Sequence, residues 1–182
     1  KKIDLSVSNS VKIRSLFFEF FQTKDFKKDY LKLGLEIQSH FKIPKKFFVL
    51  QQNPTPRVFK PGDHGTSLHS DYWYGHGKKF YTVWVPMIGL NKNSSFEMVK
   101  SNKENKKIYS LINKKKSLLE KINKINIETF CVLPKSNQAA IFSSELLHKS
   151  TNNLSKNLRI SFDFRFGQKN DKSSYKNLQS WY

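Results

Sequence analysis

The segment 158–166 alternates strictly between apolar and polar side chains. A period of two places alternate residues on opposite faces of an extended strand. This pattern predicts a β-strand with one face in an apolar core and the other carrying polar and charged groups. The apolar set is Leu158, Ile160, Phe162, Phe164 and Phe166, and the polar set is Arg159, Ser161, Asp163 and Arg165.

Other short segments also favour strands, and proline, glycine and asparagine separate them. Several short strands without intervening helices are typical of an antiparallel sandwich or barrel. The expected fold is therefore mainly β with flanking helices. The predicted strands, besides 158–166, are 47–50, 57–60, 80–87, 96–99, 130–133 and 139–142.

Two regions read as helical. In residues 8–41, apolar side chains recur every three to four positions, with a break expected near 22–25. Residues 100–128 hold nine lysines and three glutamates around an apolar seam that includes Ile108, Leu119, Ile122 and Ile125. We expect an amphipathic helix inserted between two strands, with a contact to a partner or an anionic surface as the alternative. No internal repeat is found, so residues 1–182 are expected to form a single domain, with the core in 47–167.

The formal charge of +19 suggests nucleic-acid binding at first sight. However, only four of the 33 basic residues are arginine, the residue that groove and phosphate readers favour. Nucleic acid is therefore an unlikely partner, and a small molecule, with a bias toward anionic ones, is expected. The single cysteine, Cys131, cannot form an intrachain disulfide, which favours a reducing, cytoplasmic location. No apolar run is long enough to predict a membrane span.

The residues that point to chemistry are His69, Asp71 and His148. Positions i and i+2 of an extended strand face the same side, so His69 and Asp71 could both reach one ion. His148 follows 79 residues after His69 and supplies a third ligand. Two imidazoles and one carboxylate form the facial triad of non-haem Fe(II) oxygenases, which leaves positions open for an oxoacid and O2. Zinc hydrolysis is less favoured, because it does not need an interior arginine.

Arg159 follows His148 by 11 residues and lies on the polar face of the alternating segment. A guanidinium pointing into the interior could clamp the distal carboxylate of a dicarboxylic cosubstrate through two charge-assisted hydrogen bonds. Ser161, on the same face, could add a further hydrogen bond.

Candidate substrate residues surround the first metal motif. An aromatic loop follows Asp71 directly and could stack on a ring-shaped substrate or simply cover the core. A strand-like run further upstream could also reach the pocket. The candidates are Tyr72, Trp73, Tyr74, His76, Gln51, Asn53 and Arg165.

Five segments together resemble the Fe(II)/2-oxoglutarate-dependent dioxygenases. The likeness is strongest to the phytanoyl-CoA dioxygenase-like branch, in particular to its streptomycin-biosynthesis hydroxylase-like group. It covers about residues 47–167, and the metal and arginine motifs are its most specific part. The segments are FKPGD (59–63), LHSDYWYGH (68–76), VWVPM (83–87), HKSTNN (148–153) and LRISFDFR (158–165).

This resemblance implies a double-stranded β-helix, also called a jelly-roll or cupin-like fold. His69, Asp71 and His148 would hold Fe(II). Arg159 and Ser161 would bind 2-oxoglutarate, and Trp84 would line the cosubstrate pocket. The implied reaction consumes O2, converts 2-oxoglutarate to succinate and CO2, and hydroxylates a small polar, carbohydrate-like metabolite.

Two alternatives stay open. A demethylase of alkylated nucleic-acid bases is one, because Arg159 and Arg165 lie six apart, as do the paired arginines of the nucleic-acid repair branch. Ser161 and Asp163 depart from that branch, which usually carries Asn and Thr there. The other alternative is a non-catalytic jelly-roll binding module, which the intact triad disfavours.

Overall fold

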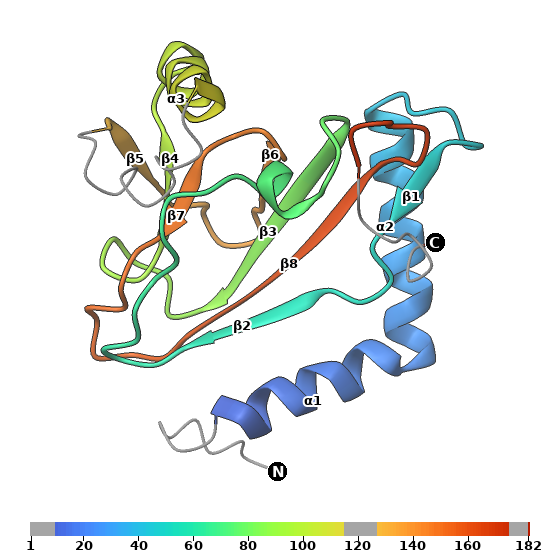
Figure 1. Ribbon diagram of the computed structural model, residues 1–182. Helices are drawn as coiled ribbons and strands as arrows, with labels where there is room; N and C mark the ends of the chain where they lie inside the picture. The colour runs from blue at the N-terminus through green and yellow to red at the C-terminus, as the bar shows by residue number, and fades with distance from the viewer. Residues whose placement is uncertain (1–9, 115–126, 175–181) are drawn as a thin grey trace.

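The computed structural model describes residues 10–114, 127–174 and 182 (Figure 1). Two helices precede the strands, and a third helix interrupts them, so the expectation of a mainly β fold with flanking helices is confirmed. The second half of the lysine-rich insertion, with Leu119, Ile122 and Ile125, lies outside the described residues. The elements are α1 (Ser10–Gln22), α2 (Lys24–His40), β1 (Phe48–Leu50), β2 (Thr55–Phe59), a 3-10 helix (Asp71–Tyr74), β3 (Phe80–Ile88), β4 (Phe96–Val99), α3 (Asn102–Lys114), β5 (Thr129–Val132), β6 (Ala140–Ser143), β7 (His148–Ser150) and β8 (Arg159–Gln168).

Strand β8 is the centre of the larger sheet. It pairs antiparallel with β3 on one side, and β3 pairs in turn with β6. On the other side, β1 and β2 pair with successive parts of β8, with Leu50 opposite Phe166 and Arg57 opposite Ser161. The alternating segment predicted at 158–166 is therefore a strand with neighbours on both edges, which explains why both of its faces are largely buried.

The apolar face of β8 packs against the N-terminal helices. Phe164 and Phe166 join Tyr30 and Ile37 of α2 in one cluster, and Ile160 packs with residues of α1 and β2 in another. The expected break in the helical region is also confirmed. Thr23 separates α1 from α2, and its side chain accepts a hydrogen bond from the backbone N–H of Phe26 at 3.3 Å, which caps the second helix.

The smaller sheet has the order β5–β4–β7 and lies against the opposite face of the larger one (Figure 1). Phe96 and Met98 of β4 pack with Trp84 of β3 and Phe142 of β6. The ring centroids of Trp84 and Phe96 are 4.6 Å apart. These contacts hold the two sheets together. The polar face of β8 faces the space between the sheets.

One expectation about the metal motif needs correction, and one strand next to it was not expected. His69 and Asp71 do not lie on one continuous strand, because only His69 forms an isolated bridge and Asp71 begins the 3-10 helix. Strand β7 was not predicted, since three residues are too few for a recognisable alternation. Within the described residues, none of the helices is long and apolar enough to cross a membrane.

We predict that Phe164→Ala destabilises the protein by about 3–5 kcal/mol, because this ring of β8 is fully buried against Tyr30 of α2 and its removal leaves a cavity. Phe18→Ala, which removes a ring that is 47 % exposed on α1, is the matched control and should cost much less. Chemical denaturation of both variants measures the difference. Equal losses would contradict this packing.

Candidate metal centre and its cavity

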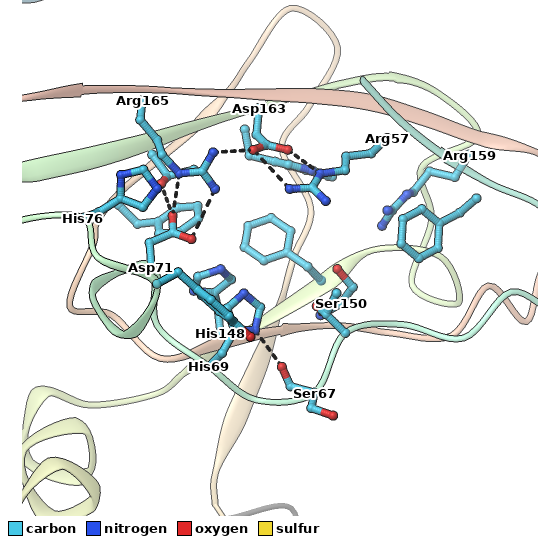
Figure 2. Close-up of a pocket in the computed structure, with 17 residues that line it drawn as sticks. Arg57, Ser67, His69, Asp71, His76, His148, Ser150, Arg159, Asp163 and Arg165 are labelled. Carbon is cyan, nitrogen blue, oxygen red and sulfur yellow. Dashed lines mark hydrogen bonds and ion pairs between the residues drawn. The ribbon is translucent and has the colours of Figure 1, made fainter. Parts of the chain in front are cut away.

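A two-residue backbone bridge brings the two candidate histidine ligands together. The N–H of His69 donates to the carbonyl of His148 at 2.9 Å, and the N–H of His148 donates back to His69 at 2.8 Å. Directly opposed residues of an antiparallel pair point to the same side. The two imidazoles accordingly lie next to each other, with ring centroids 4.3 Å apart (Figure 2).

Both imidazoles are held by a second hydrogen bond to the backbone. Nδ1 of His69 lies 2.6 Å from the carbonyl oxygen of Ser67, and Nδ1 of His148 lies 2.9 Å from that of Leu146. A carbonyl only accepts, so Nδ1 carries a proton in each ring, and in the neutral tautomer this leaves the lone pair on Nε2. This arrangement is typical of metal-ligating histidines, whose other nitrogen is fixed by a backbone or carboxylate acceptor.

Asp71 completes a set of three possible ligands. One ligand atom from each of His69, Asp71 and His148 lies within 4.8 Å of the others, so a single ion could contact all three. Asp71 is only 3 % exposed and sits at the start of the 3-10 helix, directly after the bridge. Two nitrogen donors and one oxygen donor on one side of an ion would leave coordination positions open toward the cavity.

The carboxylate of Asp71 is oriented by two neighbours. Thr82 donates its hydroxyl proton to Oδ2, and Arg165 donates from Nε to Oδ2 at 3.1 Å and from Nη2 to Oδ1 at 3.2 Å. Burial opposes the ionisation of Asp71, but the Arg165 charge and these hydrogen bonds outweigh it and hold its pKa well below the ordinary range. A carboxylate has about four lone-pair sites, so three hydrogen bonds still leave one for a metal ion.

The imidazole of His148 is held in its neutral form. Burial, together with the neighbouring His69, lowers the pKa of His148 from about 6.5 to about 4. A neutral imidazole is the form that binds a metal.

Arg165 is one member of a chain of charges along the polar face of β8 (Figure 2). Its Nη1 donates to Oδ2 of Asp163 at 2.9 Å, and Oδ1 of Asp163 accepts from Nε of Arg57 at 2.6 Å. The order Asp71, Arg165, Asp163, Arg57 places opposite charges next to each other, which compensates their removal from water. Arg57 and Asp163 were not expected as site residues, although the alternation of β2 and β8 puts both on the cavity side.

Arg159 lies at the far end of the same face and is only 2 % exposed. Its Nη1 donates to the carbonyls of Ser94 and Ser95 at 3.0 and 3.2 Å, and its guanidinium carbon lies 4.0 Å from the centre of the Phe59 ring. Burial and the nearby Arg57 lower the pKa of Arg159 to about 10, which leaves it charged at neutral pH. Within the described part of the chain, neither Nε of Arg159 nor the Ser161 hydroxyl, both buried, has a hydrogen-bond partner.

These groups surround a cavity of about 420 Å3 between the two sheets (Figure 2). Eight of the residues singled out from the sequence line it. The remaining wall includes Arg57, Phe59, Thr82 and Asp163. The eight are His69, Asp71, Tyr74, His76, Trp84, His148, Arg159 and Arg165.

Five other candidates lie outside the cavity wall. Trp73 packs into an apolar cluster with Leu68 and Leu147, and the Tyr72 ring stands near Lys78, with the ammonium 5.6 Å from its centre. Gln51 and Asn53 bond to each other in the turn between β1 and β2. Ser161 is buried and does not line the cavity, although it lies on the same face of β8 as Arg159. Tyr72 and Trp73 point away from the cavity because they lie in the 3-10 helix, which turns successive side chains in different directions.

Helix α3 contacts both segments that carry the candidate ligands, a role that its lysine-rich pattern does not predict. Asn105 accepts from the N–H of Leu147 at 2.9 Å and donates to the carbonyl of Glu145 at 3.1 Å, just before His148. One turn later, the hydroxyl of Tyr109 donates to that of Ser70 at 2.7 Å. Residues i and i+4 share one face of a helix, so this face contacts both metal motifs at once.

No known family model matches the chain, and no curated protein matches it either. Solved structures do resemble it. AviO1 from Streptomyces viridochromogenes Tue57 aligns with a TM-score of 0.53 at 12 % identity, over 79 % of this chain and 59 % of that one. EvdO2 from Micromonospora carbonacea var. aurantiaca, complexed with 2-oxoglutarate, gives 0.51 at 10 % identity, over 82 % and 62 %. At such low identity these likenesses show a shared fold, and the chain spans less than two thirds of either protein.

The low pKa of His148 predicts how the metal-free protein responds to acid. The unfolded chain takes up this proton near pH 6.5 and the folded chain only near 4, so folding stability is lost as the pH falls through this window. We expect the melting temperature of the wild type to fall by roughly 6–12 °C more than that of His148→Asn over this range, as for a difference of about 3 kcal/mol in a domain of this size. His40→Asn, at an exposed histidine, is the control. Parallel curves for wild type and His148→Asn would contradict this assignment.

The hydrogen bonds of Asn105 to the segment before His148 lead to a separate prediction. Asn105→Ala removes two hydrogen bonds that position the segment before His148, and should weaken the binding of a divalent metal by about tenfold. Competition with a metal chelator, below the melting temperature of each variant, measures this affinity. Asn170→Ala, in the exposed turn after β8, is the control and should bind like the wild type. An affinity within twofold of wild type for Asn105→Ala would show that α3 does not position the ligands.

Proposed function

We propose that this protein is an Fe(II)- and 2-oxoglutarate-dependent oxygenase that hydroxylates a small polar metabolite. The observation that carries the proposal is the pairing of two features on one cavity. At one end, His69, Asp71 and His148 offer three ligand atoms with both Nε2 lone pairs available. At the other end, Arg159 is buried with Nε lacking a partner within the described residues.

The residues present fit the two groups that this chemistry requires. Two imidazoles and a carboxylate match the facial triad of non-haem iron, and they leave room for further ligands. The buried Nε of Arg159 and hydroxyl of Ser161 lack protein partners among the described residues, which suits a carboxylate acceptor that is not part of the chain. Because an unpaired buried donor costs free energy, a ligand carboxylate at this end would remove that cost.

In the proposed reaction, iron and 2-oxoglutarate would supply the oxidising chemistry: O2 and 2-oxoglutarate are consumed, succinate and CO2 are released, and one oxygen atom enters a C–H bond of the substrate. The three ligands would hold the ion, and Thr82 and Arg165 keep the Asp71 carboxylate ionised and oriented. Arg159 would hold the distal carboxylate of 2-oxoglutarate, and Ser161, which is buried on the same face of β8 and does not line the cavity, is proposed only as an additional donor. Trp84 and Phe142 provide apolar walls that exclude water from the space between.

The fold likeness supports this proposal. EvdO2, which shares the fold, was solved with 2-oxoglutarate bound. The two facing antiparallel sheets agree with a double-stranded β-helix, and we include this fold, and membership of the phytanoyl-CoA dioxygenase-like branch, in the proposal. The cavity of about 420 Å3 suits a metabolite of modest size, and Tyr74 and His76 on its wall could contact a carbohydrate-like ring.

Anaerobic binding of Fe(II) and 2-oxoglutarate tests the proposal. We expect the wild type to bind both, His69→Ala to lose the metal, and Arg159→Met to bind 2-oxoglutarate about 10- to 100-fold more weakly with its metal affinity kept. Arg14→Met, at an arginine of α1 that bonds to the carbonyl of Val58, is the matched control. Succinate release with O2 then measures turnover.

Three results would count against the proposal. A wild-type protein that takes up no metal would favour the non-catalytic binding module. Unchanged 2-oxoglutarate affinity in Arg159→Met would remove the assigned cosubstrate site. Turnover stimulated by alkylated single-stranded DNA, with salt-sensitive affinity, would favour the nucleic-acid demethylase instead.

A further inference from the structure

The charged side chains on the cavity wall do not balance. Three guanidinium groups, those of Arg57, Arg159 and Arg165, face two carboxylates, those of Asp71 and Asp163. One positive charge is therefore left over. The divalent ion and the dianionic cosubstrate of the proposed function cancel each other, so the surplus remains in the loaded site.

The surplus is located at Arg57. Arg165 is enclosed by two carboxylates, with contacts of 3.1 and 2.9 Å to Asp71 and Asp163. Arg159 is buried at the end assigned to the cosubstrate. Arg57 forms an ion pair with Asp163 only, and Asp163 also forms an ion pair with Arg165. In addition, its side chain is 42 % exposed, so a molecule entering the cavity can reach it.

The geometry leaves one edge of Arg57 available. Its Nε bonds to Asp163 Oδ1 at 2.6 Å, and its Nη2 makes a longer contact of 3.4 Å to Oδ2. Nη1 takes part in neither bond. Figure 2 shows this guanidinium between Asp163 and Arg159, pointing into the cavity. A planar guanidinium with a free edge is the group that binds carboxylate and phosphate oxygens through paired hydrogen bonds.

The proximity of Arg57 to Arg159 also favours the binding of an anion beside Arg57. Like charges side by side in a partly enclosed site repel, and Arg57 contributes to the lowered pKa of Arg159. The distal carboxylate of the cosubstrate carries one negative charge, which balances one of these two neighbouring guanidinium groups. A second anionic group beside Arg57 would relieve the other and would not displace the ion pair that orients Arg165.

We propose that Arg57 anchors an anionic group of the substrate, a carboxylate or a phosphate, so that the oxygenase acts on an anionic small molecule. This inference rests on the proposed function and names the substrate class of the same site. The substrate would enter along the exposed side of Arg57 and place its remaining part against Trp84, Phe142 and the metal ligands.

The test uses acetate and inorganic phosphate as probes, each titrated into anaerobic protein loaded with Fe(II) and 2-oxoglutarate. Calorimetry and the visible charge-transfer absorption of the loaded site report binding. We expect Arg57→Gln to weaken binding of at least one probe by about tenfold, Arg57→Lys to retain part of it, and Arg14→Gln to match the wild type. The stronger probe identifies the group as carboxylate or phosphate.

Two results would overturn the inference. Unchanged affinity of Arg57→Gln for both probes would show that Arg57 is only a counter-ion of Asp163. An equal loss of 2-oxoglutarate affinity in Arg57→Gln would place Arg57 in the cosubstrate site. The proposed function fails separately, if the wild type binds neither Fe(II) nor 2-oxoglutarate. In that case, binding of acetate and phosphate is measured on the metal-free protein. If Arg57→Gln does not change this binding, the inference about Arg57 is also overturned.

Discussion

The candidate site depends on the backbone bridge between His69 and His148. Two hydrogen bonds of 2.9 and 2.8 Å join segments that lie 79 residues apart in the sequence. Because directly opposed residues of an antiparallel pair share a side, this single bridge determines that the two imidazoles face one point. The bridge is continuous with β7, and β7 pairs with β4, so the ligands are carried by the smaller sheet rather than by a free loop.

The second constraint is the two-sided character of β8. Its apolar face is covered by α1 and α2, which fixes the strand in place. Its polar face carries Arg159, Asp163 and Arg165 into the cavity, where charges are costly unless they are paired. The alternating order from Asp71 through Arg165 and Asp163 to Arg57 meets this requirement. It also couples the orientation of a metal ligand to residues more distant along the strand, since each charge is positioned by the next.

The sequence predicted what depends on local periodicity. The alternation at 158–166 and the helical spacing at 8–41 are signals within one segment, and the structure has β8, α1 and α2 at these places. Features that depend on contacts between distant segments were missed. Asp163 was recognised as polar but not as the partner of Arg57, which lies 106 residues away. The brace from α3 to the metal motifs could not be read from a lysine-rich pattern, which shows only that one face of the helix is apolar.

The loop after Asp71 shows the limit of reasoning from neighbours in sequence. Four aromatic or imidazole residues follow the metal motif closely, yet only Tyr74 and His76 reach the cavity, and Tyr72 and Trp73 turn toward α3. A 3-10 helix rather than a strand decides this, because side chains no longer alternate. The three candidate ligands were identifiable from the sequence, because their chemical types and order match a facial triad.

A crystal structure of the iron-loaded protein, with anomalous scattering recorded at the iron edge, tests the central claim most directly. The account predicts one iron peak in contact with Nε2 of His69, Nε2 of His148 and one carboxylate oxygen of Asp71, with the Arg165 ion pair to Asp71 retained. An iron ion bound through Nδ1 of either histidine, or bound away from Asp71, would contradict it.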